Sequence, residues 1–296
     1  MLRWSSVNLH HICRFWAWLS VMATAAAVAI LGVFLLWRGA RTLSLGLLFG
    51  DAPILAAITG RVPVWEGIWP ACVGSLCLAA LASALAIPLG LASGIYLTRF
   101  APARLKKSLV LGIDLLAGIP SIVMGLFGFT LILLLRRTFW PEATTCLLLA
   151  AVCLGLLVLP YIISTTRNVF ESLPATLHLT ATALGLTPWQ AVAHVLLPAA
   201  VPGLIGGVLL AVSRAVEDTA VIMLTGVVAN AGLPAGLTGK FEALPFAIYY
   251  LAAEHQSPAE LDRGFGAALV LLALTWALFQ GARYCQRLLM RRWPMR

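Results

Sequence analysis

The segment 171–226 reads ESLPATLHLTATALGLTPWQAVAHVLLPAAVPGLIGGVLLAVSRAVEDTAVIMLTG and decides the fold of this chain. Its first half, up to Pro198, is amphipathic, and its second half is an apolar run long enough to enter a membrane. Three charged residues, Arg214, Glu217 and Asp218, lie inside that apolar run. A polar elbow outside the membrane continues here into a membrane helix with buried charges. This arrangement indicates a site that receives an input and is connected, through the helix, to a pathway across the membrane.

The amphipathic half predicts two short helices separated by a sharp corner. Pro174 suits the first turn of a helix, where a missing N–H loses no partner. Gly185 suits the position just beyond a helix end, because it accepts positive φ. A second helix then begins, with Thr187 as its N-cap, Pro188 in its first turn and Gln190 completing a Thr-x-x-Gln capping box. The corner is therefore expected at Gly185.

The composition is that of a membrane protein. Of the 296 residues, 61% are hydrophobic and 10% are charged, whereas soluble domains carry about 25% charged residues. We expect one integral membrane domain over residues 1–296. The net charge of +9 needs no nucleic acid, because basic residues collect beside membrane helices. The six cysteines lack metal-ligand spacing, and the chain has no GxxxxGK[ST] motif. We therefore expect no metal, no cofactor and no ATP hydrolysis by the chain itself.

Six apolar runs are long enough to cross the hydrocarbon core, which takes about 20 residues of helix. They cover approximately residues 15–37, 71–98, 109–135, 143–163, 199–224 and 265–289. The runs predict an all-α membrane protein with six transmembrane helices.

The distribution of Lys and Arg predicts the orientation of these helices. With both termini in the cytoplasm, twelve of the 20 basic residues lie inside, seven lie outside, and Arg214 lies within the membrane. The inside set is Arg3, Arg14, Arg99, Arg104, Lys106, Lys107, Arg167, Arg283, Arg287, Arg291, Arg292 and Arg296. This bias agrees with the positive-inside rule, and it places the elbow, residues 164–198, in the cytoplasm.

The elbow resembles the cytoplasmic loop of ABC-importer permeases, which has the form EAA-x3-G-x9-I-x-LP. Here Gly185 is followed by nine residues and then by VLLP at 195–198. The family's Glu-Ala-Ala corresponds to Leu179, Thr180 and Ala181, so the acidic residue is absent. The resemblance implies a coupling helix that docks into a groove on a separate ATPase subunit. The residues that it assigns to this coupling are Thr180, Ala181, Gly185, Leu197 and Pro198. The alternative is an ordinary interfacial hairpin lying on the bilayer.

Several further stretches resemble PstA, the permease subunit of phosphate importers. The third run contains GIPSIVMGLFGF at 118–129, similar to the family's VPSIVYGLFG, and the fifth contains SRAVEDTAVIMLTG at 213–226, similar to RAxGETxPLLLTG. The resemblance covers nearly the whole chain. It implies the type I ABC-importer permease fold, with a core at about 71–285, in the inner membrane of a bacterium. The implied partners are an ABC ATPase dimer, a homologous PstC-like permease, an external phosphate-binding protein, phosphate and membrane lipids.

The charges of the fifth run have two interpretations. In a continuous helix, Arg214 is three residues from Glu217 and four from Asp218, so the three could share one face. They could form a salt bridge that merely locks the bundle, or they could line the path. An arginine fork suits an oxyanion. A neighbouring acid can accept a hydrogen bond from protonated phosphate, whereas sulfate has no proton to give, and an unpaired buried acceptor disfavours the wrong anion. Thr219 follows directly and joins the candidate path residues.

A second candidate element is the break at Gly118, Pro120 and Ser121. A helix that restarts near Pro120 would direct free N–H groups at the path, which is a ready anion site. The alternative is an ordinary proline kink. Two other functions remain open from the sequence, namely a permease for another oxyanion such as sulfate or molybdate, and a membrane-embedded enzyme.

Overall fold

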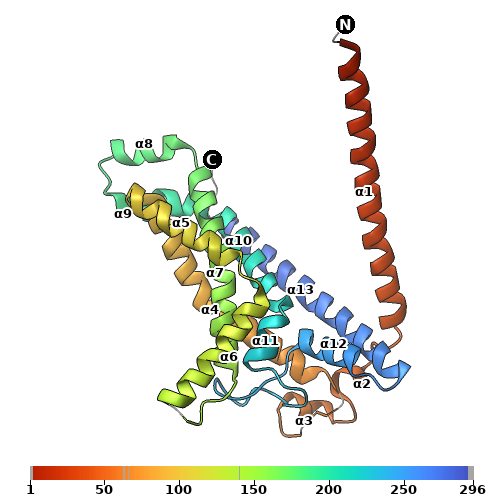
Figure 1. The fold of residues 1–296 in the computed structure, drawn as a ribbon. Coiled ribbons are helices and arrows are strands. Elements are labelled where there is room, and N and C mark those ends of the chain that lie inside the picture. Colours follow the sequence, from red (N-terminus) through yellow and green to blue (C-terminus); the bar gives the residue numbers. More distant parts are fainter. Residues whose placement is uncertain (1–2, 63, 66, 140, 293–296) are drawn as a thin grey trace.

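The computed structural model describes residues 3–62, 64–65, 67–139 and 141–292, and the regular elements in this part of the chain are helical (Figure 1). The elements are α1 (Arg3–Gly39), α2 (Leu45–Phe49), α3 (Ile54–Ile58), α4 (Trp69–Arg99), α5 (Ala103–Ala117), α6 (Ser121–Thr138), α7 (Leu147–Ser172), α8 (Ala175–Ala183), α9 (Pro188–Ala191), the π-helical η1 (Val192–Leu196), α10 (Leu197–Glu217), α11 (Ala220–Thr225), α12 (Leu244–Ala253) and α13 (Pro258–Arg292). The all-α prediction is confirmed.

Six stretches of helix among the described residues are long and apolar enough to cross a membrane. They are His11–Gly39, Trp69–Arg99, Ser121–Thr138, Leu147–Ser172, Pro188–Glu217 and Pro258–Leu288. Figure 1 shows the beginning of α1, the elbow helix α8 and the far end of α13 at one end of the molecule, with α2 and α3 at the other. The elbow therefore shares one end of the bundle with both ends of the described chain.

Two of the six predicted runs are divided into separate helices in the structure. The run at 109–135 is not one helix, because α5 ends at Ala117 and α6 begins at Ser121. Proline at position 120 has no N–H for an intrahelical bond and disfavours helical geometry in the residue before it. The run at 199–224 is also divided, because α10 ends at Glu217 and α11 begins at Ala220. At its other end this helix extends back through η1 into the elbow, so Pro198 does not separate elbow from span.

The centre of the bundle is α7, whose residues Leu154, Val158 and Ile162 are almost fully buried. α4 lies beside α7 and in the same direction. A Cβ added at Gly90 would lie 2.5 Å from Ile162 Cγ2, and one at Gly94 would lie 2.5 Å from Thr166 Cβ. Lipid tails are as apolar as side chains, so helices in membranes associate through close van der Waals packing at small residues. The glycines of α4 permit that approach.

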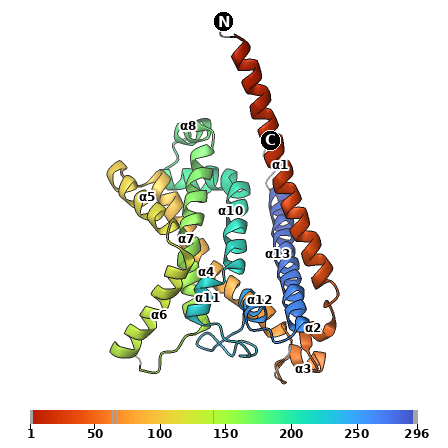
Figure 2. The same ribbon diagram turned by 45° about the vertical axis from the view of Figure 1, so that its right-hand side comes forward.

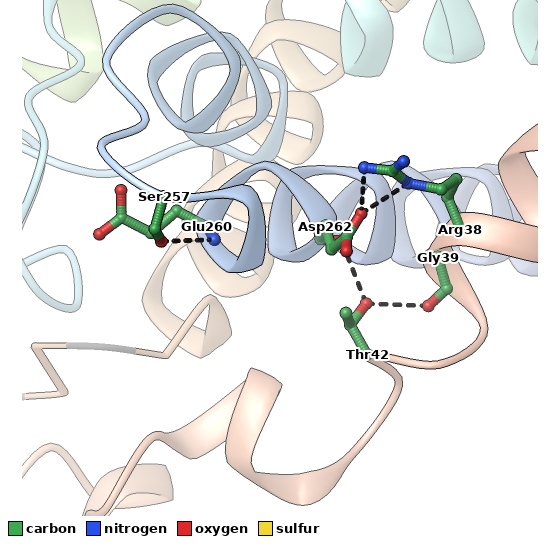
Figure 3. Close-up of polar contacts among 6 residues, drawn as sticks. All are labelled: Arg38, Gly39, Thr42, Ser257, Glu260 and Asp262. Carbon is green, nitrogen blue, oxygen red and sulfur yellow. Dashed lines mark hydrogen bonds and ion pairs between the residues drawn. The ribbon is translucent and has the colours of Figure 1, made fainter.

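α1 meets the rest of the molecule at its far end, against the start of α13, and residues 11–34 are all exposed (Figures 1 and 2). Figure 3 shows the polar contacts of this joint, where the Arg38 guanidinium lies 2.7 Å from the Asp262 carboxylate. The Thr42 hydroxyl donates to the backbone oxygens of Gly39 and Asp262. A half-exposed ion pair contributes at most about 1 kcal/mol, so the pair orients the joint more than it stabilises it.

Candidate functional site

The elbow turns at Gly185, as the sequence predicts. Its φ is +71°, in the left-handed region that favours glycine. The Gly185 N–H donates to the Thr182 carbonyl at 3.0 Å, and the Leu186 N–H donates to the Ala181 carbonyl at 3.1 Å. These two bonds are the Schellman arrangement that ends a helix and satisfies its last carbonyls. The corner is therefore fixed by bonds within six residues of chain.

The second elbow helix begins with the predicted capping box. The Gln190 N–H donates to Thr187 Oγ1 at 3.4 Å, and the Thr187 N–H donates to Gln190 Oε1 at 2.9 Å. Pro188 occupies the first turn. Pro174 is the residue before α8 rather than its first helical residue, one position from the prediction.

The elbow presents apolar side chains to its surroundings. Leu179, Leu184 and Trp189 are each about two-thirds exposed or more, at 66%, 71% and 66%. Thr180 is also exposed, whereas Ala181 is buried. Figure 1 shows α8 at the outer limit of the molecule, beyond the bundle. A projecting segment with several exposed large apolar residues has the character of a contact surface for another protein.

Three contacts brace the elbow against the α4–α5 corner. The rings of Phe100 and Trp189 are 6.3 Å apart, Lys106 Nζ lies 2.9 Å from Glu171 Oε1, and Arg99 Nη2 donates to the Phe170 carbonyl at 3.3 Å. The elbow is thus connected to α5, which leads to the break before α6.

The helix that leaves the elbow places Arg214 about halfway along the length of the bundle. α10 runs antiparallel to α7, because a Cβ at Gly203 would lie 2.9 Å from a Val169 methyl and one at Gly207 would lie 2.1 Å from a Thr165 methyl. Continued for seven residues, this register places Arg214 level with Val158. That position is near the midpoint of α7, a helix that is long and apolar enough to cross a membrane.

The three charges of α10 do not form the predicted shared face. The helix ends at Glu217, and Asp218 is extended, with φ −72° and ψ 124°. Asp218 is buried, and its Oδ1 accepts from the Val221 N–H at 2.9 Å, which caps the start of α11. Glu217 is exposed and accepts from the Ser213 hydroxyl at 3.2 Å. Within the described residues, Arg214 is exposed and pairs with neither acid, so the locking salt bridge is absent.

The break before α6 is complete rather than a kink. Pro120 is extended, with φ −59° and ψ 140°, and its carbonyl accepts from the N–H groups of Val123 and Met124. The two N–H groups before them, of Ser121 and Ile122, lie in the first turn and have no carbonyl within the helix to bond. Gly118 has a negative φ of −82°, so the turn does not depend on the special freedom of glycine.

The two breaks lie within about one helical turn of each other. α6 and α11 run side by side in the same direction, because a Cβ at Gly125 would lie 2.9 Å from the Ala220 carbonyl and one at Gly128 would lie 2.6 Å from the Thr225 methyl. Ala220 is the first residue of α11, whereas Gly125 lies four residues, about one turn, beyond the start of α6 at Ser121. Segments about 100 residues apart thus bring two helix interruptions to within about one turn of each other in the bundle.

The loop between α11 and α12 contains a residue that sequence reasoning missed. Glu242 is buried, and its carboxylate accepts from the Gly232 N–H at 2.7 Å. Burial raises its pKa, opposed in part by hydrogen bonds from the backbone of Gly232 and Ala231. Glu242 lines a cavity of about 340 Å³ with residues of α12 and the start of α13. Figure 1 shows these elements toward the end of the bundle opposite the elbow. A single acid in an apolar stretch, EALPFAIYY, was the available sequence feature.

Comparison with known proteins assigns the chain to a family. Residues 86–293 match the family described as the binding-protein-dependent transport system inner membrane component. The chain belongs to this family. This inner membrane component is a multi-pass transport subunit rather than a catalytic one. The described residues contain no group of three His, Cys, Asp or Glu side chains that could hold a metal ion.

Relatives of this inner membrane component include named permeases. It is 33% identical over 207 residues to the phosphate transport system permease protein PstA 1 of Mycobacterium tuberculosis, covering 70% of this chain and 66% of that protein. It is 30% identical over 264 residues to PstA of Yersinia pestis, covering 86% and 84%. It is also 30% identical to the phosphate permease PstC of Mesorhizobium japonicum, covering 71% of each. The chain thus spans just under two thirds of the mycobacterial protein.

Solved structures share the fold. A chain of the MetNI methionine ABC transporter in an inward-facing conformation superposes with a TM-score of 0.60 and 21% identity, covering 75% of this chain and 97% of that one. A chain of a bacterial ABC transporter that imports the polysaccharide alginate gives 0.56 and 12%, covering 93% and 98%. At these identities the likeness shows the architecture alone. It confirms the predicted ABC-importer permease fold.

Proposed function

We propose that this permease subunit forms half of the path of an ATP-driven phosphate importer. The observation that carries the proposal is Arg214, an exposed guanidinium at mid-membrane with no acid bound to it in the described chain. A charge facing lipid at that depth would cost roughly 2.5–3.5 kcal/mol even on the mildest scales. The Arg214 face of α10 therefore meets water or another polypeptide. The names of the relatives support phosphate as the solute.

The anion meets Arg214 first and a neighbouring acid second. The planar guanidinium donates two parallel hydrogen bonds to an oxyanion. Glu217, one turn further along the same helix and also exposed, accepts a hydrogen bond from the P–OH group of protonated phosphate. Asp218 has a different role, because its carboxylate is buried and occupied with the Val221 N–H. Asp218 and Thr219 shape the start of α11 beside the path, while the first-turn N–H group of Ser121, after Pro120, contributes a further donor.

The elbow transmits the work of ATP hydrolysis. Its exposed residues Leu179, Leu184 and Trp189 fit the apolar groove of an ABC ATPase, of which a dimer serves two homologous permeases. The corner at Gly185 and the exposed Thr180 lie at this contact, with Ala181 packed beneath. Leu197 and Pro198 begin the helix that leads to Arg214. A second, PstC-like permease completes the path, and an external binding protein delivers phosphate to it.

The orientation follows from the side on which the ATPase must lie. With the elbow in the cytoplasm, both termini are cytoplasmic and residues 233–239 are external, in a single domain over residues 1–296. Cysteine labelling in sealed right-side-out vesicles tests this arrangement. An impermeant thiol reagent added outside should modify a cysteine at Thr238 and spare one at Thr187. Modification of the Thr187→Cys variant would reverse the orientation.

Uptake by the assembled complex tests the function. Membrane vesicles containing the permease pair, the ATPase and the binding protein should accumulate radiolabelled phosphate with ATP, and excess sulfate should not compete. The variant with both Arg214→Gln and Glu217→Gln keeps the helix neutral and folded, so it should assemble normally yet lose phosphate uptake. Arg137→Gln, at the exposed end of α6, is the matched control and should transport normally. Normal phosphate uptake by the double variant would remove Arg214 from the path.

A further inference from the structure

The helix from Pro188 to Glu217 contains one turn of a different kind. Between α9 and α10 the backbone forms the π-helix η1, in which the Val192 carbonyl accepts from the N–H of Leu197, five residues later. A π turn holds one residue more than an α turn, and such turns inside α-helices occur frequently at functional sites. This one separates the elbow helices α8 and α9 from α10, the helix that carries Arg214.

The sequence explains the position of the π turn. Pro198 has no N–H to donate to the His194 carbonyl four residues earlier, and in a regular α-helix its ring would collide with that carbonyl. A wider turn immediately before Pro198 removes the collision. Pro202 repeats the defect four residues later, on the same side of the helix. Its own carbonyl accepts a hydrogen bond from Gln286 Nε2 of α13 at 3.0 Å.

The π turn is held on one side alone. Val192 and Leu196 are 2% and 1% exposed, and they pack in one cluster with Phe170 of α7. On the opposite side His194 is exposed, and its neighbours Ala193 and Val195 are half-buried. Beyond the turn, α10 is fixed against α7 by Gly203 and Gly207. A weakened backbone ladder thus lies between a projecting elbow and a tightly packed helix.

We propose that the π turn at Val192–Leu196 is the joint at which this helix changes shape during transport. The proposal rests on the proposed function, because the elbow must move with the ATPase. Bending at the turn lets α8 and α9 follow the ATPase while Phe170 remains the fulcrum. Pro198 is the positioning residue that creates the joint, and Gln286 holds the α10 side of it still.

The extra residue provides a decisive variant. Deleting Ala193 from the π turn converts it to an α turn and leaves the elbow and Arg214 in their present register. Deleting Val208 from the regular part of α10 instead rotates everything beyond it by about 100°. We expect the first deletion to insert and to co-purify with the ATPase at the wild-type ratio. The second, which displaces Ala211 and Ala215 from the core, should fail to assemble.

The functional readouts use the full complex in proteoliposomes. With Ala193 deleted, ATP hydrolysis should persist while ATP-driven phosphate uptake falls by at least about tenfold, within the usual range of coupling between sites. Pro198→Ala restores the missing N–H and should also reduce uptake. Spin labels on Thr187→Cys and Asn168→Cys, both exposed, should show an ATP-dependent change in distance that the deletion abolishes.

The outcomes separate the joint from the function it serves. If the Ala193 deletion fails to insert, or if it and Pro198→Ala both take up phosphate at the wild-type rate, the joint is wrong and the permease assignment stands. If the wild-type complex takes up no phosphate at all, the function is wrong, and the spin-label distance still decides whether the turn bends with ATP.

Discussion

The two ends of the helix 188–217 are built in opposite ways. At the elbow end, the capping box and the corner at Gly185 satisfy the backbone with partners a few residues away. At the path end, Arg214 and Glu217 are exposed without an ion pair in the described chain, and Asp218 leaves the helix. The backbone groups of the elbow corner find their partners within the elbow, whereas the charged side chains of the path end have no ion-pair partner in the described chain.

The largest effect should come from breaking the elbow end at Gly185. Gly185→Val places a β-branched residue at φ +71°, which such residues strongly resist. Uptake should be abolished while the protein still inserts. Gly112→Val in α5 is the matched control, since a Cβ there meets nothing within 4 Å, and it should transport normally. Wild-type uptake with normal ATPase co-purification in the Gly185→Val variant would contradict the coupling role.

Neighbouring glycines in the middle of α10 sharpen the comparison. A Cβ at Gly207 would lie 2.1 Å from Thr165 Cγ2, whereas one at Gly206 meets nothing within 4 Å. Gly207→Ala should destabilise the chain by about 1–3 kcal/mol through overpacking. Gly206→Ala should be neutral or slightly stabilising, because alanine favours helix. Thermal unfolding in detergent measures both, and equal effects would show that α10 does not pack closely on α7.

Substitutions at Asp218 test whether a side-chain cap within the chain stabilises the path end. Asp218→Ala removes the acceptor of the Val221 N–H, and loss of a helix cap costs about 0.5–2 kcal/mol. Asp218→Asn keeps an acceptor oxygen and should lose less. Glu217→Ala, exposed on the preceding residue, should change unfolding by no more than about 0.5 kcal/mol. A larger loss at Glu217 than at Asp218 would reverse the roles given to the two acids.

The smallest effect concerns the loop at the far end of the bundle. Burial raises the pKa of Glu242 above its ordinary value of 4.5, so the folded chain binds this proton more tightly than the unfolded chain. Its stabilising contribution is full below pH 4.5 and is lost as the pH rises through the folded-state value.

Comparison of the wild-type chain with the Glu242→Gln variant isolates this contribution. The charged groups Glu254, His255, Glu260 and Arg263 line the same cavity and are present in both proteins. The unfolding temperature should therefore depend less steeply on pH in the variant than in the wild-type chain. If the unfolding temperature depends on pH equally in both proteins, the pKa of Glu242 does not differ between the folded and unfolded states.

The sequence predicted what is determined locally. Gly185, Thr187 and Gln190 specify their corner through backbone preferences and bonds within a few residues, so the elbow could be predicted residue by residue. The number of spans followed from apolar length, although two of the six runs are divided in the structure. The fate of Asp218 could not be predicted in this way. Whether a buried acid pairs with Arg214 or caps a new helix depends on the packing of α11 against α6, which places two segments about 100 residues apart in contact.

The π turn lies between these cases. Pro198 could be read from the sequence. The spacing of apolar residues, however, could not distinguish a helix that ends at a proline from one that forms a wider turn to accommodate it. Burial of Val192 and Leu196 against Phe170 keeps the chain helical on both sides. Tertiary packing therefore decided an element whose cause is a single residue.

The central claim, that the anion path runs past Arg214 and the first turn of α6, is tested most directly by cysteine protection. In a variant without native cysteines, Ser121→Cys in the assembled complex should react with a small hydrophilic thiol reagent. Phosphate supplied with its binding protein and ATP should slow that reaction, while sulfate should not. Leu126→Cys, exposed on the same helix, is the control and should react slowly under all conditions. If the cysteine at position 121 is inert, or if phosphate leaves its reaction rate unchanged, the path does not run there.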